Sequence, residues 1–261
     1  MRDGAGKSVK TPNANNVKAT FVGVAHKAVQ FWALLFCAAY AYVDELAAIL
    51  AWSFDYVQKG GDAEPSERNW LRDETGGSVY LRLSTRPLEQ IKRTIDPALR
   101  QGIIDGAYWM RKPGPNCQVV VAYTGAVAPE AIESIGLMGE DRRDVGLLAV
   151  TSADRLNAGW TAAQRARERG LVNARSHIER LLAEVPPHAA IVTVCDAHPA
   201  TLGWLGAIHG HRTRALGVEH FGQTGSIAEL YRHYGIDANA IVAAAESIAP
   251  GRPIRYLKAL P

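Results

Sequence analysis

Cysteine is scarce and widely spaced in this sequence. Cys37, Cys117 and Cys195 are the three cysteines among 261 residues, and no two of them form a C-x-x-C pair. The spacing argues against an even framework of disulfides and against a zinc knuckle. We therefore expect a cytoplasmic protein, in which the thiols stay reduced.

The sequence also lacks a strong excess of charge of either sign. It has 29 basic and 26 acidic residues, which give a net charge of +3. This bias is too weak to predict a nucleic-acid partner. The densest basic segment, "QRARERG" at 164–170, contains a glutamate and is typical of a solvent-exposed helix face.

No hydrophobic run is long enough for a typical membrane span. The longest, Ala28–Val43, has 16 residues and is interrupted only by Gln30, whereas a spanning helix needs about 20 apolar residues. The polar stretch before it is long for a signal peptide, and no small-x-small cleavage site follows. We expect no membrane association. The apolar run is typical of a buried helix or of a stretch that is not authentic domain sequence. Residues 1–40 as a whole are expected to be an atypical lead-in that is either poorly ordered or unrelated to the rest of the chain.

Several nucleotide-binding and hydrolase motifs are missing. Gly6, Lys7 and Ser8 resemble the end of a phosphate-binding P-loop, but its first glycine would fall on Met1 and no strand precedes it. No G-x-G-x-x-G follows a strand and no G-x-S-x-G is present. A small doubly wound hydrolase or reductase is therefore the least favoured of three functional hypotheses.

What the sequence does contain, from residue 117 onward, is an alternation of apolar strands and amphipathic helices. Near-continuous apolar runs indicate strands buried on both faces, and this predicts an α/β fold with a mainly parallel open sheet and helices on both faces. Upstream, we expect a helix from Asp44, a strand at 78–85 and a linker at 85–116. The strands expected in the main domain are 117–123, 145–152, 189–197 and 213–218, and the helices expected there begin at Pro129, Ser176, Pro199 and Ser226.

Loops at the carboxyl ends of parallel strands usually hold the ligand site. The loops expected at these ends are 124–130, 151–160, 196–201 and 219–226. The polar residues expected there or nearby have ordinary structural explanations, because strand-to-helix turns need polar groups to satisfy backbone donors and two histidines without a third ligand make a poor metal site. The candidates considered are the pair Asp196 and His198, the pair His209 and His211, and the pair Tyr123 and Thr124.

The stretch Gly217–Asp237, "GVEHFGQTGSIAELYRHYGID", is the most distinctive in the chain. Ser226 and Glu229 have the spacing of a capping box. Gly235 is placed as a left-handed helix stop, and Asp237 as the cap of the next helix. These assignments leave the turn residues Glu219, His220, Gln223 and Thr224 without a structural explanation.

This stretch resembles the pattern G-x-[DE]-x-F-G-x-[ST], followed by L-x-x-x-[FY]-G, found near the C-terminus of transketolases and related thiamin diphosphate enzymes. The likeness extends from about Ala41 to Ile248 and is strongest to the decarboxylating component of homodimeric, bacterial-type pyruvate dehydrogenase. It implies a remnant of a pyrimidine-binding domain with a linker at 41–112 and a transketolase-type C-terminal domain at 113–261. The other segments that carry it are 41–58, 76–90, 119–133, 147–160 and 192–206.

The resemblance implies thiamin diphosphate and magnesium as cofactors of the parent family, together with pyruvate metabolism. Partners implied by kinship are a second copy or the rest of the parent enzyme, and a dihydrolipoyl acyltransferase core. The family's cofactor motif begins with G-D-G, which is absent here, and Gly61–Asn69 is too short to replace it. We expect a truncated chain that is inactive alone and binds no cofactor or metal.

No catalytic residue is therefore predicted, and the weak candidates are His220, Glu219 and His198. Whether the parent enzyme acts on pyruvate, another 2-oxo acid or a ketose stays open. The alternative to a truncated enzyme is a non-catalytic assembly or dimerisation module of the same superfamily.

Overall fold

The computed structural model describes residues 48–53, 86, 88, 93–139, 144–220 and 222–249. The chain divides into two units, Met1–Val43 and Asp44–Pro261, and all described residues belong to the second. The expected lead-in, the strand at 78–85 and most of the helix from Asp44 lie outside the described residues. Residues 48–53 of that helix are helical, as predicted.

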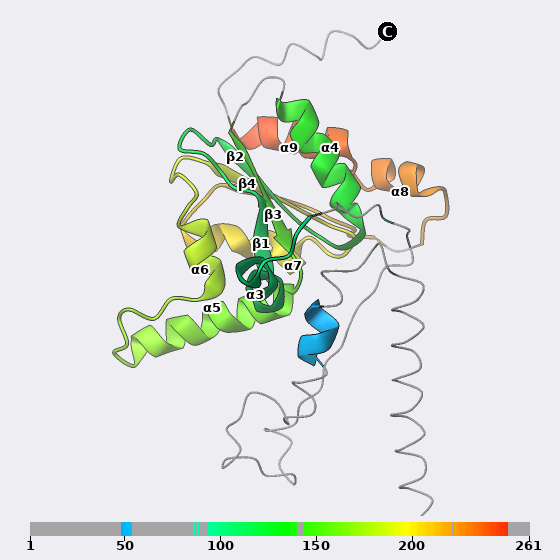
Figure 1. Cartoon of the computed structure of the whole chain (residues 1–261). Coiled ribbons are helices and arrows are strands. Elements are labelled where there is room, and N and C mark those ends of the chain that lie inside the picture. Colours follow the sequence, from blue (N-terminus) through cyan, green and yellow to red (C-terminus); the bar gives the residue numbers. More distant parts are fainter. Residues whose placement is uncertain are drawn as a thin grey trace, which may run out of the picture. The chain divides into compact units, whose positions relative to one another are not determined.

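The described strands form a single mixed sheet with the order β1-β3-β2-β4-β5 (Figure 1). β1 is antiparallel to β3, and every other neighbouring pair is parallel. This confirms the predicted α/β fold with a mainly parallel sheet. The strands are β1 (Ala107–Arg111), β2 (Val119–Thr124), β3 (Val145–Val150), β4 (Ala190–Cys195) and β5 (Thr213–Leu216).

Helices cover both faces of the sheet, which explains the continuous apolar sequences of the central strands. α4 and α9 pack against one face, and α7 packs against β4 and β5 on the other, with α6 against β1. The helices are α3 (Pro97–Asp105), α4 (Ala128–Gly139), α5 (Ala153–Glu168), α6 (His177–Leu182), α7 (Ala200–Gly203), α8 (Ile227–His233) and α9 (Ala238–Ile248), with 3-10 turns η2 (Gly125–Val127) and η3 (Trp204–Ile208).

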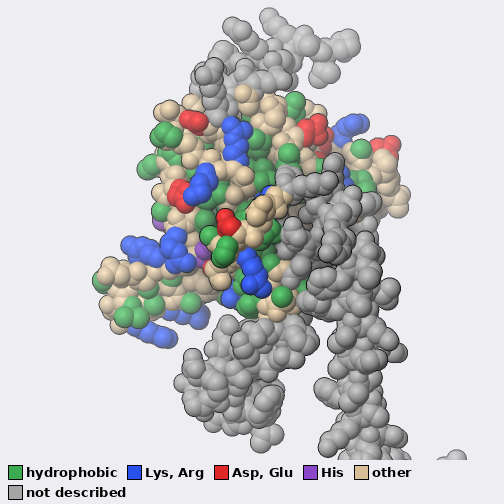
Figure 2. All heavy atoms as spheres, viewed as in Figure 1, with side chains coloured by type: hydrophobic (Ala, Val, Ile, Leu, Met, Phe, Trp, Pro, Cys, Tyr) green, Lys and Arg blue, Asp and Glu red, His purple; other side chains and the backbone are tan. Residues whose placement is uncertain are grey.

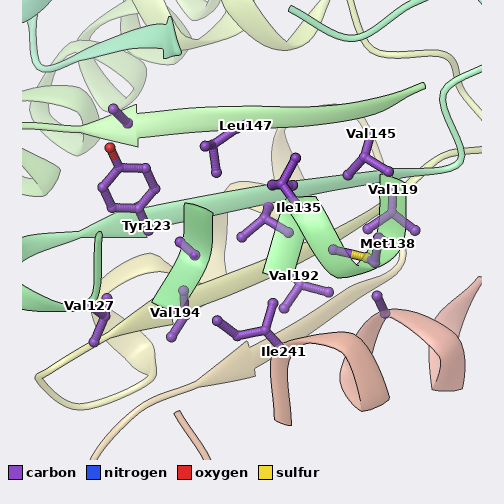
Figure 3. Close-up of a cluster of buried hydrophobic side chains, with 14 of the residues drawn as sticks. Val119, Tyr123, Val127, Ile135, Met138, Val145, Leu147, Val192, Val194 and Ile241 are labelled. Carbon is purple, nitrogen blue, oxygen red and sulfur yellow. The ribbon is translucent and has the colours of Figure 1, made fainter. Parts of the chain in front are cut away.

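Alternate residues of each central strand serve different cores, because successive side chains of a strand point to opposite faces. On β2, Val119 and Val121 join the core under α4 and α9, whereas Val120 joins the opposite core. Figure 3 shows the first core, in which Ile135 of α4 and Ile241 of α9 meet the strand side chains.

The second core lies between the sheet and α5, α6 and α7. Its fully buried aliphatic side chains include Ile178 and Leu182 of α6 and Leu202 of α7. At its border, Trp160 of α5 and Trp204 of η3 stack with their ring centroids 5.3 Å apart and an interplanar angle of 17°. This stack fixes α5 to the body of the domain near the middle of the helix.

Two parts of the structure differ from the sequence-based expectation. The segment expected to be a linker, 85–116, contains α3 and the edge strand β1, which pairs with β3. The domain boundary between 112 and 113 stays a prediction. α5 begins at Ala153, in a stretch expected to be a loop, where the Ser152 hydroxyl accepts a hydrogen bond from the Arg155 N–H at 3.3 Å.

Within the described residues, none of the helices combines the length and the apolar character that crossing a bilayer requires. The apolar run Ala28–Val43 lies outside these residues.

Candidate functional site

The carboxyl ends of β2 and β4 bring two loops into close contact. Thr124 and Cys195 are paired in the ladder, so the residues that follow them are neighbours. Gly125 has a φ of +76°, and a Cβ at this position would lie 2.7 Å from an Asp196 carboxylate oxygen. The positive φ favours glycine at position 125, and a larger residue there would also displace the Asp196 carboxylate.

Arg86 joins this edge of the sheet through contacts to η2 and α4. Its Nη1 donates to the Ala126 carbonyl at 2.9 Å and to Glu130 Oε2 at 2.9 Å, and its Nη2 lies 2.9 Å from Glu130 Oε1. The guanidinium also lies over the Tyr231 ring, 5.1 Å from its centroid. We call Arg86, Glu130 and Tyr231 the arginine clasp.

Two members of the clasp have a raised pKa, each for a different reason. The pKa of Arg86 is raised chiefly by its hydrogen bond to Glu130, against a smaller opposing effect of burial. The pKa of Tyr231 is raised chiefly by burial, which outweighs the stabilisation of its anion by Arg86. At neutral pH the clasp thus contains one firmly charged guanidinium and one neutral phenol, with the carboxylate of Glu130 held by the guanidinium.

The end of β5 lies very close to the loop after β4. Val218 N–H donates to the Ala197 carbonyl at 2.8 Å. A Cβ on Gly217 would lie 2.4 Å from that same carbonyl oxygen and 2.8 Å from the Pro199 nitrogen. The first glycine of the distinctive stretch Gly217–Asp237 is therefore needed for close packing of two backbones.

The helical features predicted in this stretch are confirmed. The Ser226 hydroxyl accepts from the Glu229 N–H at 3.4 Å, and Glu229 Oε2 accepts from the Ser226 N–H at 2.9 Å. Gly235 has a φ of +63°, Ile236 N–H donates to the Tyr231 carbonyl, and the side chain of Ile236 is fully buried. Asp237 caps α9 by accepting from the Ala240 N–H at 2.8 Å.

The turn residues of this stretch are solvent-exposed. Glu219 and His220 follow β5 at the carboxyl edge of the sheet, and Gln223 and Thr224 are exposed as well. Their place at this edge agrees with a ligand-binding loop of an open α/β sheet. A catalytic role for Glu219 or His220 stays a prediction.

Asp196 and His198 each have a local structural role. Asp196 lies against Gly125, as described above. His198 Nδ1 accepts a hydrogen bond from the Ala200 N–H at 3.2 Å, so the imidazole satisfies a free backbone donor at the start of α7. This bond requires an unprotonated Nδ1, which places the proton of a neutral His198 on Nε2.

Tyr123 belongs to the hydrophobic core rather than to a polar site. Its ring is buried in the cluster under α4 and α9, and its hydroxyl donates to the Met110 sulfur at 3.6 Å. Figure 3 shows the ring among the apolar side chains of this cluster. Thr124, its neighbour, precedes η2 and makes no side-chain capping bond.

His209 and His211 lie at the opposite edge of the sheet, where β4 and β5 begin. His209 Nε2 contacts the Glu179 carbonyl at 3.0 Å, and His211 Nδ1 contacts the Ala189 carbonyl at 3.0 Å. Their ring centroids are 6.4 Å apart. Burial lowers the pKa of His211, and the nearby His209 lowers it further, although the bond to Ala189 opposes this change.

The described residues do not fit a diphosphate-bound divalent metal. No group of three or more His, Cys, Asp or Glu side chains in this part of the chain is close enough to share a metal ion. At the carboxyl edge, the carboxylate of Glu130 is occupied by Arg86. Oxygen ligands of the kind that magnesium prefers are therefore not assembled by these residues.

Sequence reasoning missed the arginine clasp. Arg86 precedes a proline in a segment expected to be a linker. Glu130 has the position of an acidic residue in the first turn of a helix, and Tyr231 has that of a residue in an apolar stripe. One feature of the sequence could have indicated the clasp. Glu130 follows β2 and Tyr231 follows β5, and the carboxyl ends of parallel strands lie at the same edge of a sheet.

Comparison with known proteins gives matches among solved structures alone. No protein-family model matches the sequence, and no curated protein matches it. The structure of transketolase from Leishmania mexicana aligns with a TM-score of 0.42 and 19% identity over 59% of this chain. A split-gene transketolase, solved as an inactive beta4 tetramer, aligns with a TM-score of 0.38 and 15% identity over 56% of this chain.

Transketolase from Campylobacter jejuni aligns with a TM-score of 0.37 and 17% identity over 53% of this chain. The alignments cover only a part of each of these proteins: 20% of the Leishmania chain, 42% of the split-gene chain and 18% of the Campylobacter chain.

Proposed function

We propose that this chain is the C-terminal portion of a thiamin diphosphate-dependent 2-oxo acid dehydrogenase of the pyruvate type, and that by itself it is structural rather than catalytic. The sequence pattern of Gly217–Asp237, together with the segments of similar sequence that precede it in the same order, supports the parentage. The reaction of the parent enzyme is the oxidative decarboxylation of its 2-oxo acid. Thiamin diphosphate would supply the carbanion chemistry of that reaction.

The observation that carries the structural role is how the distinctive stretch is used. Gly217 allows two backbones to pack, Ser226 and Glu229 cap α8, and Tyr231 completes the arginine clasp. Several residues of the stretch thus have structural roles inside the domain, whereas the turn residues Glu219, His220, Gln223 and Thr224 are exposed. The clasp also attaches Arg86, which comes before the strands of the sheet in sequence, to α4 and α8. Such a contact is typical of a domain that holds the preceding segment of its chain in place.

The cofactor test is a calorimetric titration of the full chain with thiamin diphosphate in the presence of magnesium. We expect no saturable heat, because the described residues do not assemble magnesium ligands and the sequence has no G-D-G motif. Pyruvate-dependent reduction of an artificial electron acceptor should also be absent. Saturable binding in the micromolar range would contradict the proposal.

The second candidate function, a dedicated assembly module, is favoured by the exposed apolar residues on α4 and α8. Ile132, Leu137 and Ile227 are between 37% and 44% exposed. Size-exclusion chromatography with light scattering tests this candidate by measuring whether the full chain forms dimers. A pull-down with a dihydrolipoyl acyltransferase core then tests whether the chain still binds the partner that the family resemblance implies.

A further inference from the structure

The end of α5, the turn after it and the start of α6 form a basic segment, residues 165–180, which we call the arginine arm. Figure 1 shows α5 extending away from the sheet, with the turn at its far end. The arm contains five arginines and two glutamates, a net charge of +3 that equals the +3 of the whole chain. The remaining residues therefore have no net charge, and the excess is concentrated in the arm.

The end of the arm presents two aliphatic side chains to solvent. Leu171 is 66% exposed and Val172 is 68% exposed, the highest values among the large hydrophobic residues described as exposed. Gly170, with a φ of +96°, ends α5 and directs the chain into this turn. Figure 2 shows the projection with basic side chains along it and hydrophobic side chains at its end.

Internal hydrogen bonds hold the turn in one conformation. Leu171 N–H donates to the Ala166 carbonyl at 3.0 Å, and Ala174 N–H donates to the Leu171 carbonyl at 2.9 Å. Arg167 Nη1 donates to the Ala174 carbonyl at 2.8 Å, while its Nη2 pairs with Glu179 at 2.9 Å. A preorganised turn loses little conformational entropy when a partner binds it.

Two arginines beside the aliphatic tip are available to a partner. The side chains of Arg165 and Arg169 are exposed and make no hydrogen bond or ion pair within the described residues. Arg175 donates only to backbone carbonyls of the turn, so its charge is not neutralised there. The tip thus combines an apolar centre with a cationic border.

The chemistry of the arm favours an acidic protein surface over a membrane or a nucleic acid. Every cation in residues 165–180 is arginine, whose planar fork matches a carboxylate and which is enriched at protein interfaces. The segment has no Trp, Tyr or Phe, the residues that anchor loops at membrane interfaces or stack on unpaired bases. Aliphatic side chains at the tip suit an apolar pocket bordered by carboxylates.

We propose that the arginine arm is a docking surface for a partner protein whose binding face carries Asp or Glu residues around exposed aliphatic side chains. Leu171 and Val172 fill the apolar centre of this interface, and Arg165 and Arg169 pair with the surrounding carboxylates. The inference depends on the arm alone and does not depend on the enzymatic parentage proposed above.

The test uses the full chain and phage-displayed random peptides. Peptides are first depleted on the variant with Leu171→Ser and Val172→Ser, and the remainder is selected on the wild-type chain. We expect the selected peptides to be enriched in Asp or Glu together with Leu, Ile or Val. Failure to enrich any peptide, or enrichment without acidic residues, would overturn the proposal.

Fluorescence anisotropy with a selected peptide then measures each part of the surface. Arg169→Glu and Leu171→Ser should each weaken binding about tenfold or more. The matched controls, Arg232→Glu on α8 and Arg100→Glu on α3, change exposed arginines elsewhere and should stay within about twofold. Equal losses in the control variants would mean that the arm does not form the interface.

The other two partner classes are tested by sedimentation with vesicles of phosphatidylcholine and phosphatidylserine, and by titration with a single-stranded RNA. We expect that any binding of the vesicles or of the RNA to the wild-type chain is retained in the Leu171→Ser variant. Binding to either one that is lost in this variant would assign the arm to a lipid surface or to RNA, and would overturn the proposal.

Discussion

Arg86 and Glu130, 44 positions apart in the sequence, form a two-point ion pair in which each guanidinium nitrogen lies 2.9 Å from a different carboxylate oxygen. The pair is partly buried and is completed by the ring of Tyr231. The clasp connects three segments that are far apart in the sequence. It can therefore form only when the domain has folded around the carboxyl edge of its sheet.

Removing the charge of Glu130 should destabilise the domain measurably. In Glu130→Gln, Arg86 keeps its bond to the Ala126 carbonyl but loses its ion pair with Glu130, and we expect a loss of about 1–3 kcal/mol in the free energy of unfolding. Urea unfolding followed by tryptophan fluorescence measures this loss. Arg86→Lys is the companion variant, because it retains the charge but cannot make the two-point contact. If the free energy of unfolding changes in both variants by no more than it does for an ordinary surface substitution, the clasp does not stabilise the domain.

Gly217→Ala should destabilise the domain because the new Cβ would lie 2.4 Å from the Ala197 carbonyl oxygen, a backbone atom that also accepts the hydrogen bond of Val218 N–H. We expect a loss of about 1–3 kcal/mol. Gly136→Ala on α4 is the matched control, since nothing lies within 4 Å of its Cβ position. This change should stabilise the domain by about 0.5–1 kcal/mol, and thermal unfolding of both variants distinguishes the two outcomes.

Glu179 should contribute stability that depends on pH. Burial alone would raise its pKa, but hydrogen bonds from Ser176 and the pair with Arg167 lower it below the ordinary value of 4.5. A carboxyl whose pKa is lower in the folded state stabilises the fold above its unfolded pKa and loses that contribution as the pH falls through the folded value. Glu179→Gln should therefore cost about 1–2 kcal/mol at pH 7 and progressively less below pH 4.5.

The control for this prediction is Glu229→Gln in the second capping box. Glu229 makes the equivalent bonds to Ser226, but it is exposed and forms no ion pair within the described residues, and Arg232 has only a small electrostatic effect on it. Its substitution should have a smaller effect at pH 7. Equal effects of the two substitutions would show that the ion pair with Arg167 adds nothing.

His211 should make the fold less stable under mildly acidic conditions. Burial lowers its pKa from 6.5, and within the described residues its buried Nε2 has no hydrogen-bond partner. Between the lowered folded pKa and 6.5 the unfolded chain binds the proton more readily, so stability is complete above pH 6.5 and falls as the pH decreases. His209 is the nearest titratable neighbour and also opposes protonation.

His211→Asn tests this prediction, because the asparagine amide retains a donor for the Ala189 carbonyl but does not titrate. The free energy of unfolding, measured in urea between pH 5 and pH 8, should fall less steeply on the acidic side in this variant than in the wild-type chain. Parallel curves would mean that His211 is not the group responsible.

The central strands could be predicted from sequence because burial on both faces makes them continuously apolar, as in "CQVVVAY" and "AAIVTVC". β1 was not predicted because it is a short edge strand closely followed by Pro113 and Pro115. α5 was expected to be partly a loop because it projects from the domain: Leu156 and Ala163 are its only buried residues in the described structure, so it has no apolar stripe from which to recognise it.

In the candidate site, too, contacts between residues close in sequence could be predicted, whereas contacts between distant residues could not. The capping box of Ser226 and the cap at Asp237 depend on residues three positions apart, and the structure confirms both. The arginine clasp depends on residues whose separation in sequence has no periodic relationship, and only the folded sheet brings them together. Sequence patterns predict hydrogen bonds between residues within one helical turn. They do not predict contacts between residues that are distant in the sequence.

The strand order has a consequence for synthesis on the ribosome. β1 emerges first, but its antiparallel partner β3 is made only after β2 and α4, and β2 in turn needs β4 for its second neighbour. An edge strand that waits for its partner stays exposed while the nascent chain grows. β1 therefore stays unpaired until β3 is made, and a ribosome that paused between residues 111 and 145 would prolong the period in which "AYWMR" is open to other chains.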